Sequence, residues 1–311
     1  MSIFSRRIFS NLCKLPILQV ANRSLIKETN FRYFSEDIPN EKFELADKVA
    51  VIVGGAGEIG YSIAHTFLRN GVNNVSILDK DVTKGEEAVD KLVQKFGNSK
   101  AIFYETEITD SKNVDAALRN TILHLNGIDI VVNCAGIFND SKWEEQIQTN
   151  MIGTVVTTLL GLQHMSSSGP GHGGIVVNVA SIMGVIPSLG YPLHTMTQYG
   201  IVGFSRALGC SDQYNRTKVK IVGYCPGPTD TKLFRDAANN SINPNFSTEF
   251  LQEIDGCVVQ KPEKVAEGLC LVMETAKSGS IWVAENNDTP YEVRFPEVTA
   301  VNAKTSQAAI N

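Results

Sequence analysis

Short, strongly apolar runs alternate with amphipathic stretches along most of the chain. The strand-like runs are residues 48–53, 75–80, 101–109, 128–136, 173–181, 220–227 and 279–285. Between several of them, apolar residues recur at helical spacing, in 61–71, 86–97, 113–127 and 143–165. Strands that are apolar on both faces are typical of a parallel sheet covered by helices on both sides. The pattern therefore predicts an α/β fold with a doubly wound parallel sheet.

The alternation points to one domain rather than two. It runs for about 240 residues with no Pro-, Gly- or Ser-rich linker between the units, although the length alone allows two domains. The stretch "SSSGPGHGG" (166–174) is predicted as a loop inside this domain. We expect the domain to span 35–285 and residues 286–311 to form a C-terminal tail. Neither this tail nor the segment from about 230 to 258 carries a chemical signature.

Local signals place the ends of two helices. In 61–71, Ile63, Phe67 and Leu68 share one face, and Gly71 ends the helix. Thr83 and Glu86 have the spacing of a capping box in front of the amphipathic stretch 86–97. We therefore expect Thr83 to cap that helix.

A glycine cluster follows the first apolar run. Gly55, Gly57 and Gly60 form a G-x-G-x-x-G pattern between a strand and a helix, where bare glycines let backbone N–H groups approach a pyrophosphate. Asp79 ends the second strand, 19 residues after Gly60. A carboxylate there accepts hydrogen bonds from ribose hydroxyls and repels a 2′-phosphate, so the pattern predicts NAD rather than NADP. The alternative is a glycine turn beside a solvated aspartate.

Composition and charge exclude several classes of protein. The 311 residues are 43% hydrophobic and 20% charged, which is typical of a globular protein. Six basic residues and a single acid, Glu28, lie within residues 1–35, and the remainder has 22 basic and 32 acidic residues, a net charge of -10. An acidic body does not favour a nucleic-acid surface. Since no apolar run reaches the ~18 residues of a spanning helix, no membrane span is expected.

The first 34 residues have the composition of a mitochondrial presequence. They are rich in Arg and Ser, poor in acids and apolar at helical spacing. The stretch "RYFS" resembles a processing site, which predicts a mature start near Ser35 in the mitochondrial matrix. A disordered basic tail or a membrane-surface helix is the alternative, and the location is then cytoplasmic.

The six cysteines indicate neither disulfides nor a metal. They form no C-x-x-C pair, and no histidine lies at zinc-binding spacing from them. We interpret them as small apolar residues that fill space in the core. No metal site is predicted.

Several motifs together resemble the short-chain dehydrogenase/reductase family, over about residues 46–285. They are Gly54 and Gly60, Asp79, "NCAG" (133–136), Asn150, Ser181 and "PGPTDT" (226–231). The details "AGIFND", "GGIVVN" and "GSIWVAE" are similar to the insect-type alcohol dehydrogenase branch, which grades into hydroxyprostaglandin-dehydrogenase-like proteins. The resemblance implies a Rossmann-like sheet of about seven strands in the order 3-2-1-4-5-6-7. It also implies that NAD binds to Gly54, Gly57, Ile59, Gly60, Asp79, Ile108, Asn133, Ala135, Gly136, Gln198, Pro226, Gly227 and Thr231.

The chain departs from the family at its catalytic residues. The family uses an Asn, a Ser and a Y-x-x-x-K pair whose Tyr follows the Ser by about thirteen residues. Thirteen residues after Ser181 the chain has His194, and four further it has Gln198. Tyr191 breaks the alignment with "GIVGF" (200–204), and Tyr199 lies on a different helix face, so neither is a substitute. Val53, Cys134 and Glu58 also replace a Thr, an Asn and a Gly, and Glu58 puts a carboxylate close to the expected pyrophosphate.

These replacements leave a partial set of catalytic groups. A histidine with an ordinary pKa near 6.5 is a neutral base at pH 7 without help from a lysine. Gln198, one turn away, is able to bond the nicotinamide ribose. Ser181 is expected to polarise the substrate oxygen, and Asn150 to anchor a proton-relay water.

Two functions of different class follow. The first is an NAD-dependent oxidoreductase for an alcohol or a hydroxy or keto compound, with impaired or altered catalysis. The second is a catalytically inactive, NAD-binding pseudoenzyme that serves as a structural or regulatory subunit. For either, the resemblance implies a homodimer or homotetramer through helices 143–165 and 194–209. A generic nucleotide binder is disfavoured, because Ser181, Asn150 and "PGPTDT" then have no reason to coincide.

Overall fold

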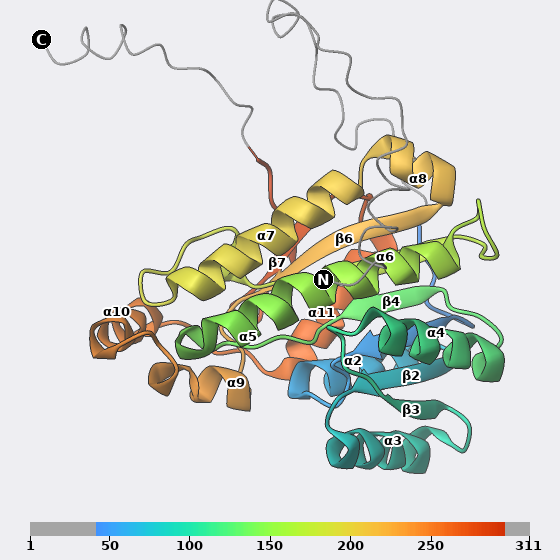
Figure 1. Ribbon diagram of the computed structural model, residues 1–311, viewed down its shortest axis with the longest axis horizontal. Helices are drawn as coiled ribbons and strands as arrows, with labels where there is room; N and C mark the ends of the chain where they lie inside the picture. The colour runs from blue at the N-terminus through green and yellow to red at the C-terminus, as the bar shows by residue number, and fades with distance from the viewer. Residues whose placement is uncertain (1–41, 296–311) are drawn as a thin grey trace, which may run out of the picture. The chain divides into compact units, whose positions relative to one another are not determined.

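The computed structural model describes residues 42–295 and contains one sheet of eight strands (Figure 1). Their order is β3-β2-β1-β4-β5-β6-β7-β8, which confirms the predicted order and adds an eighth strand. The first seven are parallel, and β8 pairs antiparallel with β7. The strands are β1 (Val49–Val53), β2 (Asn74–Asp79), β3 (Ala101–Glu105), β4 (Ile130–Asn133), β5 (Gly174–Val179), β6 (Val219–Pro226), β7 (Ile281–Ala284) and β8 (Tyr291–Glu292).

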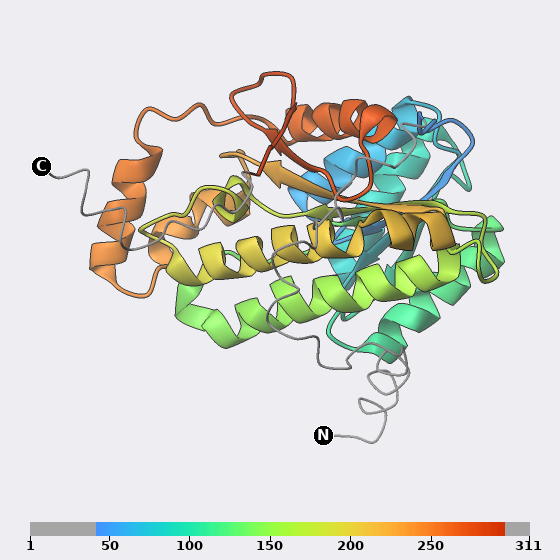
Figure 2. The same ribbon diagram turned by 90° about the horizontal axis from the view of Figure 1, so that it is seen from above.

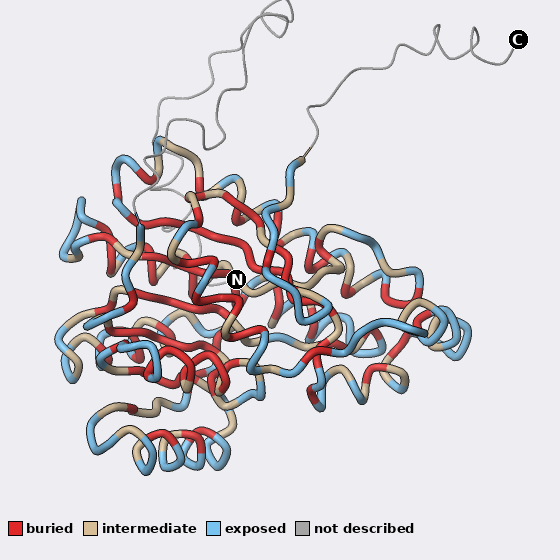
Figure 3. The backbone as a smooth tube through the Cα atoms, turned by 180° about the vertical axis from the view of Figure 1, so that it is seen from behind, coloured by how far each residue is buried: buried red, intermediate tan, exposed pale blue. Residues whose placement is uncertain are grey.

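Helices cover both faces of this sheet, as Figures 1 and 2 show. The helices are α2 (Glu58–Arg69), α3 (Val82–Phe96), α4 (Ser111–Leu125), α5 (Trp143–Ile147), α6 (Thr154–Met165), α7 (Pro192–Leu208), α8 (Ser211–Thr217), α9 (Lys232–Arg235), α10 (Pro244–Ile254) and α11 (Pro262–Thr275). Side chains of α2, α3 and α11 pack on one face, and those of α4, α6 and α7 pack on the other. Strands β1, β4 and β6 are buried along their whole length (Figure 3), which explains why their sequences are largely apolar.

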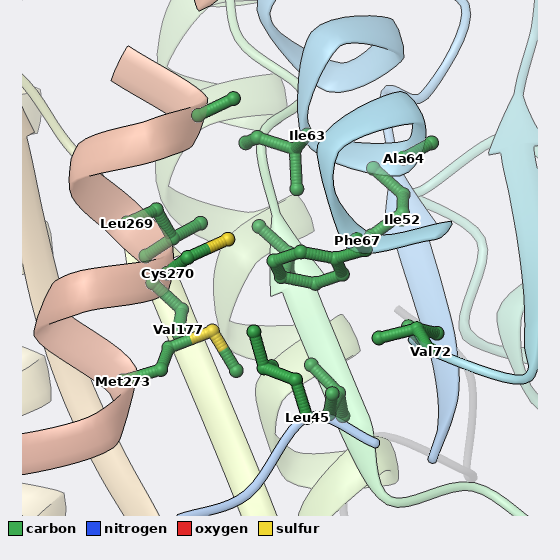
Figure 4. Packing of buried hydrophobic residues seen from close by; sticks show 14 of the residues in the cluster. Leu45, Ile52, Ile63, Ala64, Phe67, Val72, Val177, Leu269, Cys270 and Met273 are labelled. Atoms are coloured by element: carbon green, nitrogen blue, oxygen red, sulfur yellow. The ribbon is translucent and has the colours of Figure 1, made fainter. Parts of the chain in front are cut away.

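The larger core cluster lies under α2 and α11. Phe67 of α2 and Met273 of α11 are fully buried above the sheet, next to Ile52 of β1 and Val177 of β5 (Figure 4). The predicted helix face of Ile63, Phe67 and Leu68 is the face that is buried here. This packing fixes where α2 begins, and thereby the position of the glycine turn that precedes it.

The structure adds detail where the sequence pattern was weak. The predicted helix 143–165 contains a π-helical segment, Gln148–Gly153, between α5 and α6. The segment 230–258 contains α9 and α10, which lie near the N-terminal end of α7 (Figure 1). Part of the predicted tail forms β8. None of the helices between residues 42 and 295 combines the length and apolarity that a bilayer crossing requires.

The predicted presequence, residues 1–34, lies outside the described residues, and so do residues 296–311 of the tail. Cleavage and the mitochondrial location therefore stay predictions from composition.

The cap of α3 differs from the predicted capping box. The helix begins at Val82, so Thr83 lies inside its first turn and Asp81 is the N-cap residue. The Asp81 carboxylate accepts a hydrogen bond from the Lys84 backbone N–H at 3.1 Å. A spacing of three residues is met by both pairs, Thr83 with Glu86 and Asp81 with Lys84. Only the structure shows which turn is the first.

We expect Asp81→Ala to lower the melting temperature by a few degrees, because a first-turn N–H then loses its acceptor. Thr83→Ala is the matched control and should have little effect. Thermal unfolding followed by circular dichroism measures both, and a larger loss for Thr83→Ala would contradict this assignment of the cap.

Candidate active site

The turn between β1 and α2 is built on two glycines in close contact with backbone. Gly54 has a φ of +74°, and a Cβ there would lie 2.6 Å from Ala135 Cα. A Cβ on Gly60 would lie 2.3 Å from the Gly54 carbonyl oxygen. A side chain at Gly54 would collide with Ala135 after β4, and one at Gly60 would push α2 away from the turn. The turn therefore needs glycine at both positions.

A cavity of about 270 Å³ lies beside this turn, at the carboxyl edge of the sheet. Gly57 precedes α2 and offers no side chain to cap it, so the first N–H groups of the helix are left for a ligand. On the far side, Asp79 accepts hydrogen bonds from the backbone N–H groups of Ala56 and Asp81, each at 3.1 Å. A bare helix N-terminus together with a fixed carboxylate fits the pyrophosphate and ribose of a dinucleotide.

Most of the predicted cofactor residues line this cavity. They are Gly54, Gly57, Ile59, Gly60, Asp79, Ile108, Ala135, Gly136 and Thr231. Gln198, Pro226 and Gly227 line an adjoining cavity of about 150 Å³, and Ile59, Ala135, Gly136 and Thr231 line both. Asn133 lines neither. It is buried, and its amide nitrogen donates to Asn178 and Thr158, so in this geometry it supports the sheet rather than the cofactor site.

The second cavity brings together the four predicted catalytic residues. Asn150, Ser181, His194 and Gln198 all line it. The other lining residues are mostly apolar, and neither a tyrosine nor a lysine is among those that line this cavity within the described part of the chain. The structure therefore places the predicted residues in one site that has no Tyr and Lys pair.

Asn150 lies in the π-helical segment and holds the chain after β4. Its Oδ1 accepts from the Ile137 N–H at 2.8 Å, and its amide nitrogen donates to the Ile137 carbonyl at 2.9 Å and to Thr197 Oγ1 at 3.2 Å. Both amide hydrogens thus have partners inside the protein. The side chain links β4 to α7, and the predicted relay water has no amide hydrogen left to bind.

Ser181 lies directly after β5, at the start of a 3₁₀ turn, Ile182–Gly184. Its Oγ accepts a hydrogen bond from the Met183 N–H at 3.2 Å. That contact uses a lone pair and leaves the hydroxyl hydrogen to donate. The Ser181 hydroxyl is therefore able to donate a hydrogen bond to a molecule in the cavity that it lines.

His194 is buried at the start of α7, with 7% of its surface exposed. The carboxylate of Asp140 accepts from the backbone N–H groups of Leu193 and His194, each at 2.8 Å, and so fixes this end of the helix. The imidazole lies against the Phe138 ring, with centroids 4.3 Å apart. Its Nδ1 is buried without a hydrogen-bond partner.

Burial makes this histidine a weak base. Removal from water lowers the pKa of His194 to about 3, and hydrogen bonding to the backbone at Ile137 opposes the shift only in part. The ordinary histidine pKa near 6.5, expected from the residue type alone, does not hold for His194, because its burial depends on how α7 packs and not on its position in the helix. The structure gives a ring that is neutral at physiological pH and slow to accept a proton.

The neighbouring polar residues of α7 are also held inside the protein. Gln198 is buried and donates from Nε2 to Thr197 Oγ1 at 3.1 Å. Tyr191 is fully buried, its hydroxyl bonds the Ala237 carbonyl, and burial raises its pKa. Tyr199 is partly exposed and donates to the Val185 carbonyl at 2.9 Å. Neither tyrosine lines the cavity, in agreement with their exclusion from the sequence.

Three residues shape the site although the sequence motifs that contain them gave them no role in it. Phe138 packs on His194, and Asp140 holds the start of α7 from a position 54 residues away. Cys134 lines both cavities, and burial raises the pKa of its thiol to about 12, so the thiol is protonated. Asp140 lies three positions before the predicted helix 143–165, where a local helix cap is the expected role. The long-range cap of α7 is visible only in the fold.

A glycine turn, a carboxylate at the end of the second strand and a cleft at the carboxyl edge of a parallel sheet are features of a dinucleotide-binding fold. The family model described as short chain dehydrogenase matches residues 48–241. The chain belongs to this family.

Individual relatives are similar over most of their length. Alcohol dehydrogenase 1 of Ceratitis cosyra is 32% identical over 240 residues, which cover 77% of this chain and 92% of that protein. The 15-hydroxyprostaglandin dehydrogenase [NAD(+)] of Mus musculus is 29% identical over 239 residues, which cover 75% of this chain and 88% of that protein. Both branches named in the sequence analysis are thus represented.

Solved structures share the fold. Levodione reductase superimposes with a TM-score of 0.67 at 18% identity, covering 77% of this chain and 96% of that one. The 3-ketoacyl-(acyl-carrier-protein) reductase of Brucella melitensis complexed with NADH gives a TM-score of 0.65 at 22% identity. The match covers 78% of this chain and 98% of that one.

We expect the buried His194 to make folding stability depend on pH. Its pKa is about 3 when folded and near 6.5 when unfolded, so only the unfolded chain gains a proton between these values. The free energy of unfolding is therefore highest above pH 6.5, where His194 is neutral in both states, and it decreases as pH falls below 6.5. Relative to His194→Phe, the wild type should lose about 2 kcal/mol of unfolding free energy between pH 7 and pH 5.

Urea unfolding of both proteins at several pH values measures this difference. Comparing the two pH profiles removes any constant cost of the Phe substitution. Parallel profiles would show that the imidazole titrates normally in the folded protein.

Proposed function

We propose that the protein is an NAD-dependent short-chain oxidoreductase acting on an alcohol or ketone, with catalysis slowed by the loss of the usual base and cation. One observation carries the proposal. The cavity that holds Ser181, His194 and Gln198 adjoins the dinucleotide cavity and shares Ala135 and Gly136 with it. A substrate there lies next to the end of a cofactor bound along the glycine turn.

The residues present fit NAD. The α2 N-terminus would hold the pyrophosphate, and Asp79 would accept hydrogen bonds from the adenosine ribose. The name of the mouse relative, which includes NAD(+), and the NADH complex of the Brucella reductase support this choice. When bound, NAD supplies the acceptor or donor of a hydride.

Each side chain of the second cavity has a limited role. The Ser181 hydroxyl donates a hydrogen bond to the substrate oxygen and stabilises the charge that develops on it. The neutral imidazole of His194 keeps its hydrogen bond to the backbone at Ile137 and offers the unpartnered Nδ1 to the substrate. Because its pKa is about 3, it withdraws a hydroxyl proton poorly, which slows alcohol oxidation. Gln198 offers a hydrogen bond to the nicotinamide ribose but no positive charge.

The second candidate function is an NAD-binding subunit without turnover. Apolar side chains are exposed on the helices of the expected oligomer interface, which is compatible with a partner-binding protein: Ile152, Met196 and Tyr199 are each more than 40% exposed. Either function uses a homodimer or homotetramer through 143–165 and 194–209. Turnover, rather than cofactor binding, separates the two candidates.

We expect NADH to bind at least tenfold more tightly than NADPH, because the Asp79 carboxylate repels a 2′-phosphate. Asp79→Ser should narrow the difference, mainly by improving NADPH binding. Fluorescence titration gives the dissociation constants of NADH and NADPH for the wild type and for Asp79→Ser. Equal affinities of the wild type for both cofactors would remove the role given to Asp79.

Turnover should rise when the family's pair is restored. In His194→Tyr with Gln198→Lys, the lysine cation lowers the phenol pKa and holds the ribose, and we expect a gain on the order of 10²-fold or more in secondary-alcohol oxidation. Adding Ser181→Ala should abolish the gain. NADH formation on a panel of alcohols is the measurement.

The outcomes of that experiment are distinct. A slow wild type with a faster double variant supports the impaired enzyme. An inactive wild type with an active double variant identifies a pseudoenzyme on an intact scaffold. If neither turns over although both bind NADH, the binding-subunit function replaces the first proposal.

A further inference from the structure

Glu58 stands where a negative charge is unexpected. It is the first residue of α2, lines the dinucleotide cavity, and lies beside the N–H groups that would hold a pyrophosphate. An unpaired carboxylate at this point would repel a bound dinucleotide. In this structure, however, Glu58 is paired.

Both oxygens of Glu58 are bonded to the same distant segment, 230–236. Oε2 accepts from the backbone N–H of Lys232 at 2.6 Å, and Oε1 accepts from Nη2 of Arg235 at 3.1 Å. These partners are 174 and 177 positions away in the sequence. Asp230 binds the other arm of the same guanidinium. The ion pair ties the start of α2 to the whole of α9.

The segment tied down in this way covers the site. Thr231 and Leu233 line both the dinucleotide cavity and the catalytic cavity. Within residues 42–295, the hydrogen bonds and ion pairs recorded between 230–236 and α2 all end on Glu58. Breaking them would therefore free this wall of both cavities from the glycine turn.

We propose that Glu58 and Arg235 form a clasp that closes segment 230–236 over the bound dinucleotide and slows its release. This inference rests on the proposed NAD binding. Arg235 has two effects in the clasp: it offsets the charge of Glu58 beside the pyrophosphate, and it holds Thr231 and Leu233 against the cofactor. Both are positioning residues, because they act through α9 and not on the reacting atoms.

The size of the effect follows from the exposure of the pair. The side chains are 45% exposed at Glu58 and 52% at Arg235, and an exposed ion pair changes an equilibrium by a small factor. We expect loss of the clasp to raise the NADH dissociation rate about two- to fivefold. The effect should weaken as ionic strength rises, because salt screens exposed charges.

A double-mutant cycle tests the clasp in the full chain. The variants are Glu58→Gln, Arg235→Gln and the two combined, and stopped-flow displacement of NADH gives each dissociation rate. Each single variant should release NADH faster, and the combined variant should be no faster than the faster of the two single variants, since both changes remove the same Glu58–Arg235 pair. At high ionic strength, the NADH dissociation rate of the wild type should approach the rates of the variants.

Arg69→Gln is the matched control. It breaks an ion pair with Glu267 that has the same 3.1 Å separation and similar exposure but lies away from the dinucleotide cavity. Its NADH dissociation rate should equal that of the wild type. Urea unfolding without NADH reports any general loss of stability in each variant.

Three results would overturn the clasp. Slower release in Glu58→Gln would show that this carboxylate mainly repels the cofactor. Additive effects in the combined variant would show that Arg235 contacts the dinucleotide independently of Glu58. Unchanged release in both single variants, with NADH still bound, would show that the pair does not hold the segment. If the wild type binds no NADH at all, the proposed function fails first.

Discussion

The contact between Gly60 and the Gly54 carbonyl is the constraint on which the cofactor edge of this protein depends. With no side chain between them, α2 begins directly against the end of β1, and its first N–H groups face the cavity. Phe67, one and a half to two turns further along the helix, is buried against the sheet and keeps α2 in that position. A local steric requirement and a core contact thus act together, and the dinucleotide cavity exists because both are met.

The fold could be predicted from the sequence because its signals are local and repeated. A strand buried on both faces, such as Val49–Val53, has to be apolar at every position, and its amphipathic neighbours have to be helices. The short strand Tyr291–Glu292 could not be predicted this way, since both residues are exposed and β7 alone determines their pairing. The cap of α3 was misplaced because two residue pairs had the same spacing.

The members of the site were easier to predict than their chemistry. Ser181, His194 and Gln198 could be located by counting along the chain, and the structure brings them into one cavity. The low pKa of His194 could not be predicted, because it results from burial, which depends on tertiary packing. The same limit applies to Asn150, whose amide hydrogens are taken by Ile137 and Thr197. Residue identity sets what a group is able to do, and its surroundings set whether it does so.

The π-helical segment around Asn150 changes how the two halves of this helix face their neighbours. A π turn accommodates one residue more than an α-helix of the same length, as if a residue had been inserted there. Removing a residue from 148–153 would let the segment return to α-helix. In a regular α-helix, one extra residue would rotate one side of the helix by roughly 100° relative to the other, which is the angle per residue at 3.6 residues per turn. The π turn absorbs that rotation, so Asn150 keeps its bonds to Ile137 while α6 keeps its apolar face on the sheet. The extra residue thus lets the two halves of one helix meet different neighbours.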